Sequence, residues 1–108
     1  MLTVTSSKPS TCLADPWPAP TILPKITQAD DCGDYESELA VVIGKTAKNV
    51  SEADAMDYVL GYTACNDVSS RTSQLATTQW CFSKGFDGAC PIGELSSKCH
   101  VSYAWGHS

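Results

Sequence analysis

The sequence lacks the features that mark two common classes of small protein. It has no apolar run near the ~20 residues that a membrane span needs, so we expect no membrane-spanning segment. It also has no excess of basic residues. The formal net charge of its 108 residues is −5, which argues against a nucleic-acid binder, because such proteins present a basic face. A chain of this length forms one domain at most.

The cysteines lack the spacing that marks a structural zinc site. None of the six belongs to a Cys-x-x-Cys pair. The first eight residues also lack the long apolar core of a secretory signal. Reduced thiols that act as small apolar side chains are therefore favoured over a disulfide scaffold, and they predict a cytoplasmic or mitochondrial protein. Cys90, Cys99 and His100 could reach one metal ion, but their spacing matches no common pattern. A small cysteine-rich binding module is an alternative that a count of free thiols would decide.

Proline is concentrated in one segment of the chain. Five of the six prolines lie between residues 8 and 24. Because proline fixes φ and biases the preceding residue toward extended conformations, this segment is predicted to be extended rather than helical. Four apolar side chains suggest that it packs against the rest of the domain: Leu13, Trp17, Ile22 and Leu23.

Residues 39–43 form an unbroken apolar run that is rich in β-branched residues. Gly44 closes the run, which predicts a buried strand. Just before it, Glu36 and Glu38 stand two residues apart. Because side chains alternate along a strand, both carboxylates point to the same face, where they repel each other and resist desolvation. The usual explanation is a cation or a positively charged partner.

The following stretch carries the signals of a helix. Ser51 and Asp54 resemble a capping box, and Gly61 is a plausible residue to end a helix, so we predict one helix around residues 51–61. An apolar stripe at positions i, i+3 and i+4 would face the core: Met56, Val59 and Leu60. Residues 70–80 are ambiguous between a helical turn and a loop. Residues 81–93, with three glycines and a proline, predict a structured loop.

A second strand over residues 62–69 would contain the polar pair Asn66 and Asp67 near its end. A β-α-β order could place this end beside the first strand, so that the carboxylate of Asp67 converges with those of Glu36 and Glu38. Three unneutralised carboxylates at one point would resist ionisation, so a cation would be needed. Ligands that are all oxygen favour a hard ion, Mg²⁺, Mn²⁺ or Ca²⁺, over zinc.

Four motifs together resemble the fumarylacetoacetate hydrolase superfamily, in that family's order and near its spacing. The resemblance covers about residues 8–93. The segments Lys8-Pro-Ser and Asp15-Pro-Trp-Pro resemble fungal members in particular. The resemblance implies a mixed α/β, mainly β, fold: part of a β-sandwich roll with one helix around residues 51–61, which forms a homodimer in the full-length protein. The motifs are Asp34-Tyr-Glu-Ser-Glu-Leu-Ala-Val-Val-Ile-Gly-Lys45, Asn49-Val-Ser-Glu-Ala-Asp-Ala-Met-Asp-Tyr-Val-Leu-Gly-Tyr-Thr63, Asn66-Asp-Val-Ser-Ser-Arg71 and Lys84-Gly-Phe-Asp-Gly-Ala-Cys-Pro91.

The resemblance implies a metal site and a catalytic lysine. Glu36, Glu38 and Asp67 match the residues with which the family holds Mg²⁺ or Mn²⁺, and Ca²⁺ is a third candidate. Lys84 matches the lysine that sits beside the metal and the substrate. Without the family, Lys84 would be interpreted as a solvated loop lysine.

The resemblance also implies a substrate class. Arg71 and Gln74 fall where the family places polar residues on the substrate side, although Thr72 stands where many members have an aspartate. The substrates are acylpyruvate-like 2-oxo acids, and the implied activity is metal-dependent hydrolysis of a C–C bond through a metal-bound enolate. Oxaloacetate decarboxylation and dicarbonyl tautomerisation share that intermediate and are alternatives. An inactive metal-binding remnant is a further one.

The two ends of the chain depart from the family. Residues 1–7 match nothing in it, and residues 94–108 resemble no part of its continuation, as a retained intron, a frameshift or a truncated gene model would produce. His100 and His107 lie in this tail and are not assigned the family's water-activating role. Because the family's catalytic domain is considerably longer, we expect this chain to expose apolar sheet faces and to fold poorly or be inactive.

Overall fold

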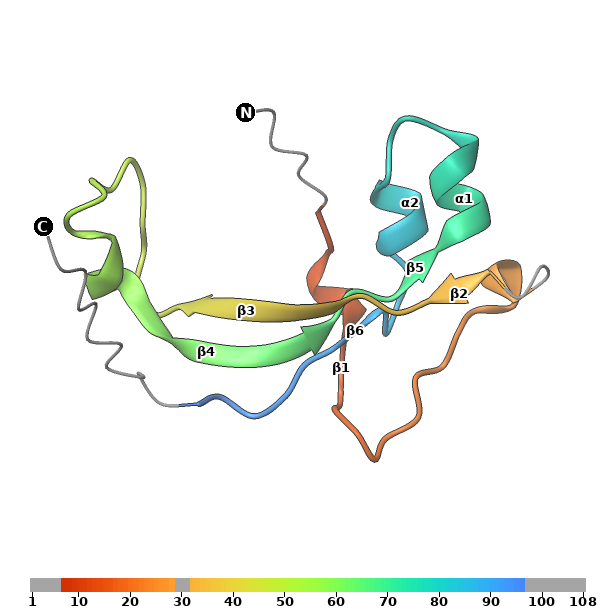
Figure 1. Ribbon diagram of the computed structural model, residues 1–108, viewed down its shortest axis with the longest axis horizontal. Coiled ribbons are helices and arrows are strands. Elements are labelled where there is room, and N and C mark those ends of the chain that lie inside the picture. Colours follow the sequence, from red (N-terminus) through yellow and green to blue (C-terminus); the bar gives the residue numbers. More distant parts are fainter. Residues whose placement is uncertain (1–6, 29–31, 97–108) are drawn as a thin grey trace, which may run out of the picture.

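A long antiparallel hairpin, with small elements gathered at one end, dominates the computed structural model, which describes residues 7–28 and 32–96 (Figure 1). The hairpin consists of β3, Ser37–Ile43, and β4, Val59–Asn66. The other strands form two short pairs: β1 (Leu13–Ala14) runs parallel to β6 (Cys90–Pro91), and β2 (Gly33–Asp34) runs antiparallel to β5 (Ser69–Ser70). The helices are the 3₁₀ helices η1 (Ser10–Cys12), η2 (Lys25–Thr27) and η3 (Ala55–Tyr58), and the α-helices α1 (Arg71–Ala76) and α2 (Cys81–Lys84). The described part is thus mixed α/β with more strand than helix, as predicted.

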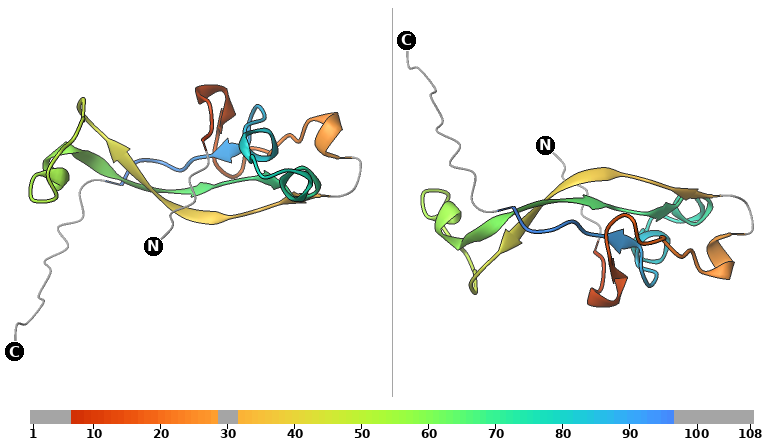
Figure 2. Two further views of the ribbon diagram at one scale, coloured as in Figure 1. Left: turned by 90° about the horizontal axis from the view of Figure 1, so that it is seen from above. Right: turned by 90° about the horizontal axis from the view of Figure 1, so that it is seen from below.

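The hairpin places the end of β4 beside the start of β3. Ser37 lies opposite Asn66 at one end of the ladder, and Ile43 lies opposite Val59 at the other. The strand predicted over residues 39–43 is confirmed. The two strands meet through antiparallel pairing rather than through the crossover of a β-α-β unit. Figure 2 shows them twisting around each other, as two-stranded ribbons do.

The helix predicted around residues 51–61 is wrong over most of its length. Only Ala55–Tyr58 is helical, as η3, and β4 begins directly after it, so Gly61 lies inside a strand and caps no helix. The predicted capping pair does form, since Ser51 Oγ donates to Asp54 Oδ2 at 2.6 Å. The chain nevertheless leaves the helix after one turn, because its backbone groups find their partners in β3.

One face of the hairpin carries large apolar side chains that stay exposed. Leu39 is 72% exposed, and Val41, Ile43 and Leu60 are each about half exposed. The interpretation of residues 39–43 as a buried strand is therefore wrong for this chain, and the expectation of an open apolar sheet face is confirmed. Met56 is also half exposed, so only Val59 of the predicted core stripe around η3 is buried.

The buried apolar residues that cluster together are few and lie at the polar end of the hairpin. Cys12, Val68 and Ala89 form it, and Leu23 packs against it from the proline-rich segment. The other apolar side chains of that segment were predicted to pack but are exposed: Leu13, Trp17 and Ile22. This core joins η1 to the segments that follow β4 and precede β6.

The chain after β4 folds back over this same end (Figure 1). α1 settles the ambiguity of residues 70–80 in favour of a helix, and α2 opens the segment that was predicted as a structured loop. Beyond β6 the chain returns along β4, where Cys65 bridges to Ile92 and Tyr62 bridges to Ser96. Among the described residues, none of the helices has the length and apolar character needed to cross a membrane.

The cysteines of the described ranges are free thiols: Cys12, Cys32, Cys65, Cys81 and Cys90. This supports the interpretation of the cysteines as reduced side chains and weighs against a disulfide scaffold. The residues of the weak zinc alternative, Cys99 and His100, lie outside the described residues, as does His107.

Candidate active site

Three carboxylates converge where the hairpin meets the two α-helices. Glu36, Glu38 and Asp67 each offer an oxygen, and these three oxygens lie within 4.8 Å of one another. Two hydrogen bonds tie their segments together: Asp67 N donates to the backbone oxygen of Glu36 at 2.9 Å, and Glu36 N donates to the side-chain Oδ1 of Asn66 at 3.1 Å. The convergence predicted from the sequence is therefore present in the structure.

The ammonium of Lys84 lies between two of these carboxylates. Its Nζ donates to Glu36 Oε2 at 2.8 Å, to Asp67 Oδ2 at 2.9 Å and to Ser69 Oγ at 2.7 Å. The Lys84 side chain is only 4% exposed, and these three bonds use all three of its donors. The chain thus supplies part of the positive charge that the carboxylates require.

The two sides of this contact keep each other charged. Burial by itself lowers the pKa of Lys84, but the hydrogen bonds to Glu36 and Asp67 outweigh it, so the pKa is raised above its ordinary value. The hydrogen bond from Lys84 lowers the pKa of Glu36 in turn. Burial opposes this effect and a second hydrogen bond from Arg71 adds to it. Each of these two pKa shifts favours the charged form, so the contact between Lys84 and Glu36 is an ion pair.

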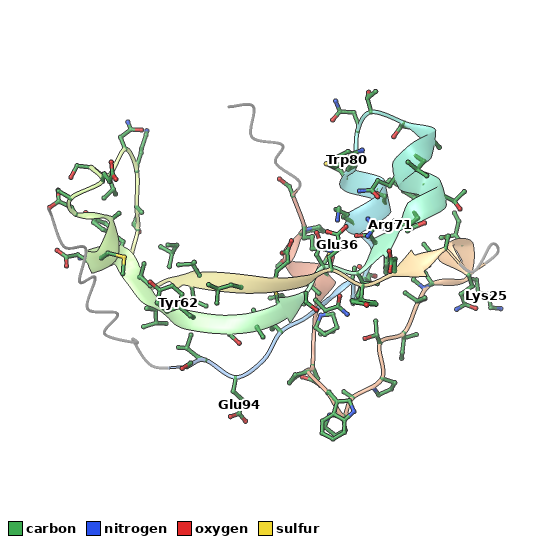
Figure 3. The ribbon with its side chains drawn as sticks, in the orientation of Figure 1. Lys25, Glu36, Tyr62, Arg71, Trp80 and Glu94 are labelled. Atoms are coloured by element: carbon green, nitrogen blue, oxygen red, sulfur yellow. The ribbon has the colours of Figure 1, made fainter. Side chains whose placement is uncertain are left out.

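Arg71 closes the outer side of the cluster. Its Nε donates to Asp34 Oδ2 at 2.8 Å, and its Nη1 donates to Glu36 Oε1 at 2.5 Å and to Gln74 Oε1 at 2.8 Å. Figure 3 shows Glu36 and Arg71 next to each other where the hairpin reaches the helices. Arg71 and Gln74 are three residues apart on α1 and therefore share a face. The Arg71 guanidinium also holds the pKa of Asp34 below its usual range.

Sequence reasoning missed three residues of this cluster, Lys8, Asp34 and Ser69. Lys8 Nζ lies 2.8 Å from Asp67 Oδ1 and 16% of its side chain is exposed. Asp34 begins the first family-like motif and Ser69 lies inside the third, so the motifs carried them without a role. For Lys8 the only signal was its place in a segment that resembles fungal family members.

The donor set fits a hard divalent cation. Asp67 Oδ1 is buried and accepts no hydrogen bond from the described residues, and its partner there is the ion pair with Lys8 at 2.8 Å. Glu38 is exposed, and the nearest side-chain partner recorded for it in the described ranges is Cys65 Sγ, 4.0 Å from Oε2. Carboxylate oxygens of this kind suit Mg²⁺, Mn²⁺ or Ca²⁺.

A cavity of about 430 Å³ lies beside the polar end of β4. Cys65 and Asn66 of β4 contribute to its lining, and Trp17 of the proline-rich segment contributes from the other side. The three carboxylate residues are not part of its lining, although Cys65 pairs across the hairpin with Glu38 and Asn66 precedes Asp67.

The family comparison agrees with the motifs. A family model described as the C-terminal domain of fumarylacetoacetate (FAA) hydrolase matches residues 6–105. This range is wider than the 8–93 over which the sequence resembles the family by its motifs. The domain boundaries drawn at residues 8 and 93 stay a prediction.

Individual relatives show the same similarity over a part of their length. The chain is 58% identical over 81 residues to a caffeoylpyruvate hydrolase of Neonothopanus nambi, which covers 73% of this chain and 28% of that protein. It is 53% identical over 62 residues to the mitochondrial oxaloacetate tautomerase fahd2 of Xenopus laevis, covering 56% of this chain and 19% of that protein. The crystal structure of a 5-carboxymethyl-2-hydroxymuconate delta-isomerase from Mycobacterium smegmatis matches with a TM-score of 0.76 and 41% identity, over 85% of this chain and 36% of that chain. The chain therefore spans between 19% and 36% of the length of these relatives.

Proposed function

Because the chain belongs to the fumarylacetoacetate hydrolase family, we propose that its carboxylate cluster binds a divalent metal ion and serves the hydrolysis of acylpyruvate-like 2-oxo acids. The observation that carries this proposal is the convergence of Glu36, Glu38 and Asp67 within 4.8 Å, with Lys84 against two of them. The similarity to a caffeoylpyruvate hydrolase supports an acylpyruvate as the substrate class.

The roles follow from the charges of the cluster. Glu36, Glu38 and Asp67 would hold Mg²⁺ or Mn²⁺, with Ca²⁺ as a third candidate. When bound, the ion supplies a Lewis acid for the 2-oxo group. Lys84 keeps a buried positive charge beside the same carboxylates, so it would act as the catalytic residue that stabilises negative charge developing on the substrate.

Arg71 and Gln74 would bind the substrate from the outer side. Arg71 has five N–H donors and spends three of them on Asp34, Glu36 and Gln74. Its Nη2 group makes no hydrogen bond to the described residues, and its side chain is 35% exposed. A guanidinium with free donors suits the carboxylate of a 2-oxo acid.

Tautomerisation of a dicarbonyl acid is a second candidate function. The similarity to an oxaloacetate tautomerase favours it. Tautomerisation needs proton transfer alone and no attack by water. Oxaloacetate decarboxylation would use the same residues. For the full-length protein we propose a homodimer in the cytoplasm or the mitochondrion, as the family resemblance and the free thiols of the described ranges suggest.

Titration with Mn²⁺, followed by the electron paramagnetic resonance signal of the free ion, tests the metal site. We expect the 108-residue chain to bind Mn²⁺ and the Glu36→Ala, Glu38→Ala double variant to bind it at least roughly tenfold more weakly. The control is Glu52→Ala, Glu94→Ala, which removes the same charge from two exposed positions. Equal affinity in the two double variants would refute the assigned ligands.

Product analysis then separates the two reactions. An acylpyruvate is incubated with the Mn²⁺-loaded chain, and released pyruvate is measured by a coupled reduction, while the loss of enol absorbance is followed in parallel. Hydrolysis predicts both signals, and tautomerisation predicts a change in enol content without pyruvate. A chain that binds Mn²⁺ and gives neither signal is a metal-binding remnant.

A further inference from the structure

Lys8 occupies a partly buried junction behind the carboxylate cluster. Its ammonium donates to the carbonyl oxygens of Val68 at 3.3 Å, Lys84 at 2.5 Å and Ala89 at 2.9 Å. These carbonyls account for all three of its N–H donors. Asp67 Oδ1 lies 2.8 Å from the same Nζ as an ion pair, although it accepts no hydrogen bond from the described residues. Lys8 therefore interacts with Asp67 as an ion pair, while hydrogen bonds to three backbone carbonyls hold its ammonium in place.

This set of contacts ties Lys8 to both partners of the buried ion pair. Asp67 presents Oδ1 to Lys8 and Oδ2 to Lys84 Nζ. Lys8 also binds the backbone carbonyl of Lys84, the last residue of α2. The other two carbonyls belong to segments that are already joined, because Val68 N donates to Ala89 O at 3.0 Å. The Lys8 ammonium thus contacts the Asp67 carboxylate and also the backbone of Lys84, whose side chain binds the same carboxylate.

We propose that Lys8 is a positioning residue for the cluster. It sets the separation between the Asp67 carboxylate and Lys84, and through Asp67 it sets the geometry offered to a divalent cation. The part that concerns the cation rests on the proposed function, whereas the arrangement of Lys8, Asp67 and Lys84 stands without it. A lysine that served only as a counter-charge would not need three carbonyls converging on its ammonium.

Charge and position predict opposite effects when Lys8 is removed. Its positive charge lies beside a candidate ligand, so on charge alone Lys8→Met should tighten cation binding. If Lys8 holds Asp67 in place, the same substitution should weaken binding by roughly 10- to 100-fold, as the loss of a partner behind a metal ligand does. The direction of the change therefore separates the two roles.

Mn²⁺ affinity of the full chain is measured for Lys8→Met, Lys8→Arg and the control Lys48→Met. Lys48 is exposed, so its variant makes the same chemical change away from the cluster. We expect both Lys8 variants to bind Mn²⁺ at least roughly tenfold more weakly and the control to match the wild type. Arginine keeps the charge but replaces a compact ammonium with a planar fork. Tighter binding in Lys8→Met, or unchanged affinity in Lys8→Arg, overturns the proposal.

A measurement without metal keeps the proposal testable if no Mn²⁺ binds. Side-chain nitrogen resonances of the ¹⁵N-labelled chain should show slowly exchanging ammonium groups for Lys8 and Lys84. Lys8→Met should remove one signal and shift the other through Asp67, while Lys48→Met leaves both. An unshifted Lys84 signal overturns the positioning role. Loss of folding in both Lys8 variants, with Lys48→Met folded, also overturns it, because Lys8 would then serve the stability of the fold. Absence of Mn²⁺ binding in the wild type refutes the proposed function alone.

Discussion

The two ends of the β3–β4 hairpin differ in how their side chains find partners (Figure 1). At the end next to α1 and α2, Lys84 lies within 2.9 Å of both Glu36 and Asp67. Along the rest of the hairpin, Leu39 and Val41 present an apolar face that the described residues leave at least half exposed. The buried charges therefore have partners of opposite sign among the described residues, whereas the apolar face of the hairpin has no covering layer there.

The difference follows from the reach of the two interactions. A buried carboxylate needs a cation at contact distance, and one ammonium supplies it. Apolar side chains are stabilised in proportion to the area removed from water, which takes a whole covering layer. A short chain can therefore hold a nearly complete polar centre on a scaffold with little core. For this reason the charged side chains of the site have their partners, although the surrounding scaffold buries few apolar side chains.

Removing Lys84 is the strongest way to break the polar end. Lys84→Met leaves Glu36 and Asp67 without the ammonium between them. We expect the free energy of unfolding to fall by about 3 kcal/mol or more, because breaking a buried ion pair leaves an uncompensated charge. Urea denaturation at neutral pH measures the change. Lys48→Met is the matched control, with an expected change within about 0.5 kcal/mol. Similar losses in the two variants would contradict the importance of the buried pair.

A matched pair of valines measures the contrast in packing. Val68 is 5% exposed in the core, and Val41 is 50% exposed on the open face of β3. Val68→Ala should cost roughly 2 kcal/mol of unfolding free energy, from two lost methyl groups and the cavity they leave. Val41→Ala should stay within about 0.5 kcal/mol. Thermal or urea denaturation compares the two. A loss at Val41 that matches the loss at Val68 and disappears on dilution would show that a second copy covers this face.

The same two ends differ in how far the sequence predicts them. At the polar end, the alternation of Glu36 and Glu38 and the placement of Asp67 predicted that three carboxylates converge, whereas Lys84 entered only through the resemblance to the family. Lys8 was not predictable. Its partners are backbone carbonyls that lie 60 to 81 residues away, and every residue carries a carbonyl, so no side-chain pattern marks them.

At the apolar end, two periodicities competed. The spacing of Met56, Val59 and Leu60 fits a helix, but burial along β4 alternates, with Val59, Gly61 and Thr63 buried. Both patterns were present in the sequence, and pairing with β3 decided between them. The exposure of the sheet face was predictable only through the family, since composition alone does not reveal a missing layer.

Acid should weaken the polar end and leave the apolar end unchanged. Hydrogen bonds from Lys84 lower the pKa of Glu36, and those from Arg71 lower the pKa of Asp34. Such carboxylates stabilise the folded state above their unfolded pKa values, about 4.3 for Glu and 3.9 for Asp. This stability is lost as the pH falls through the lower folded values. The raised pKa values of Lys84 and Arg71 act only at alkaline pH. The free energy of unfolding should therefore decline between about pH 5 and pH 3.

Arg71→Gln tests whether the outer half of the cluster contributes to this decline. Removing the guanidinium should make the plot of unfolding free energy against pH shallower over this range. This effect should be smaller than the effects of Lys84→Met and Val68→Ala, because Arg71 is 35% exposed and solvent screens its ion pairs. Val41→Ala should leave the slope unchanged, since it lies on the uncharged face. If Arg71→Gln keeps the wild-type slope, the ion pairs of Arg71 with Asp34 and Glu36 contribute nothing to the decline, and the effect of Lys84 on Glu36 accounts for it. If Val41→Ala alters the slope, the two ends of the hairpin are coupled, and the polar centre depends on whatever covers the apolar face.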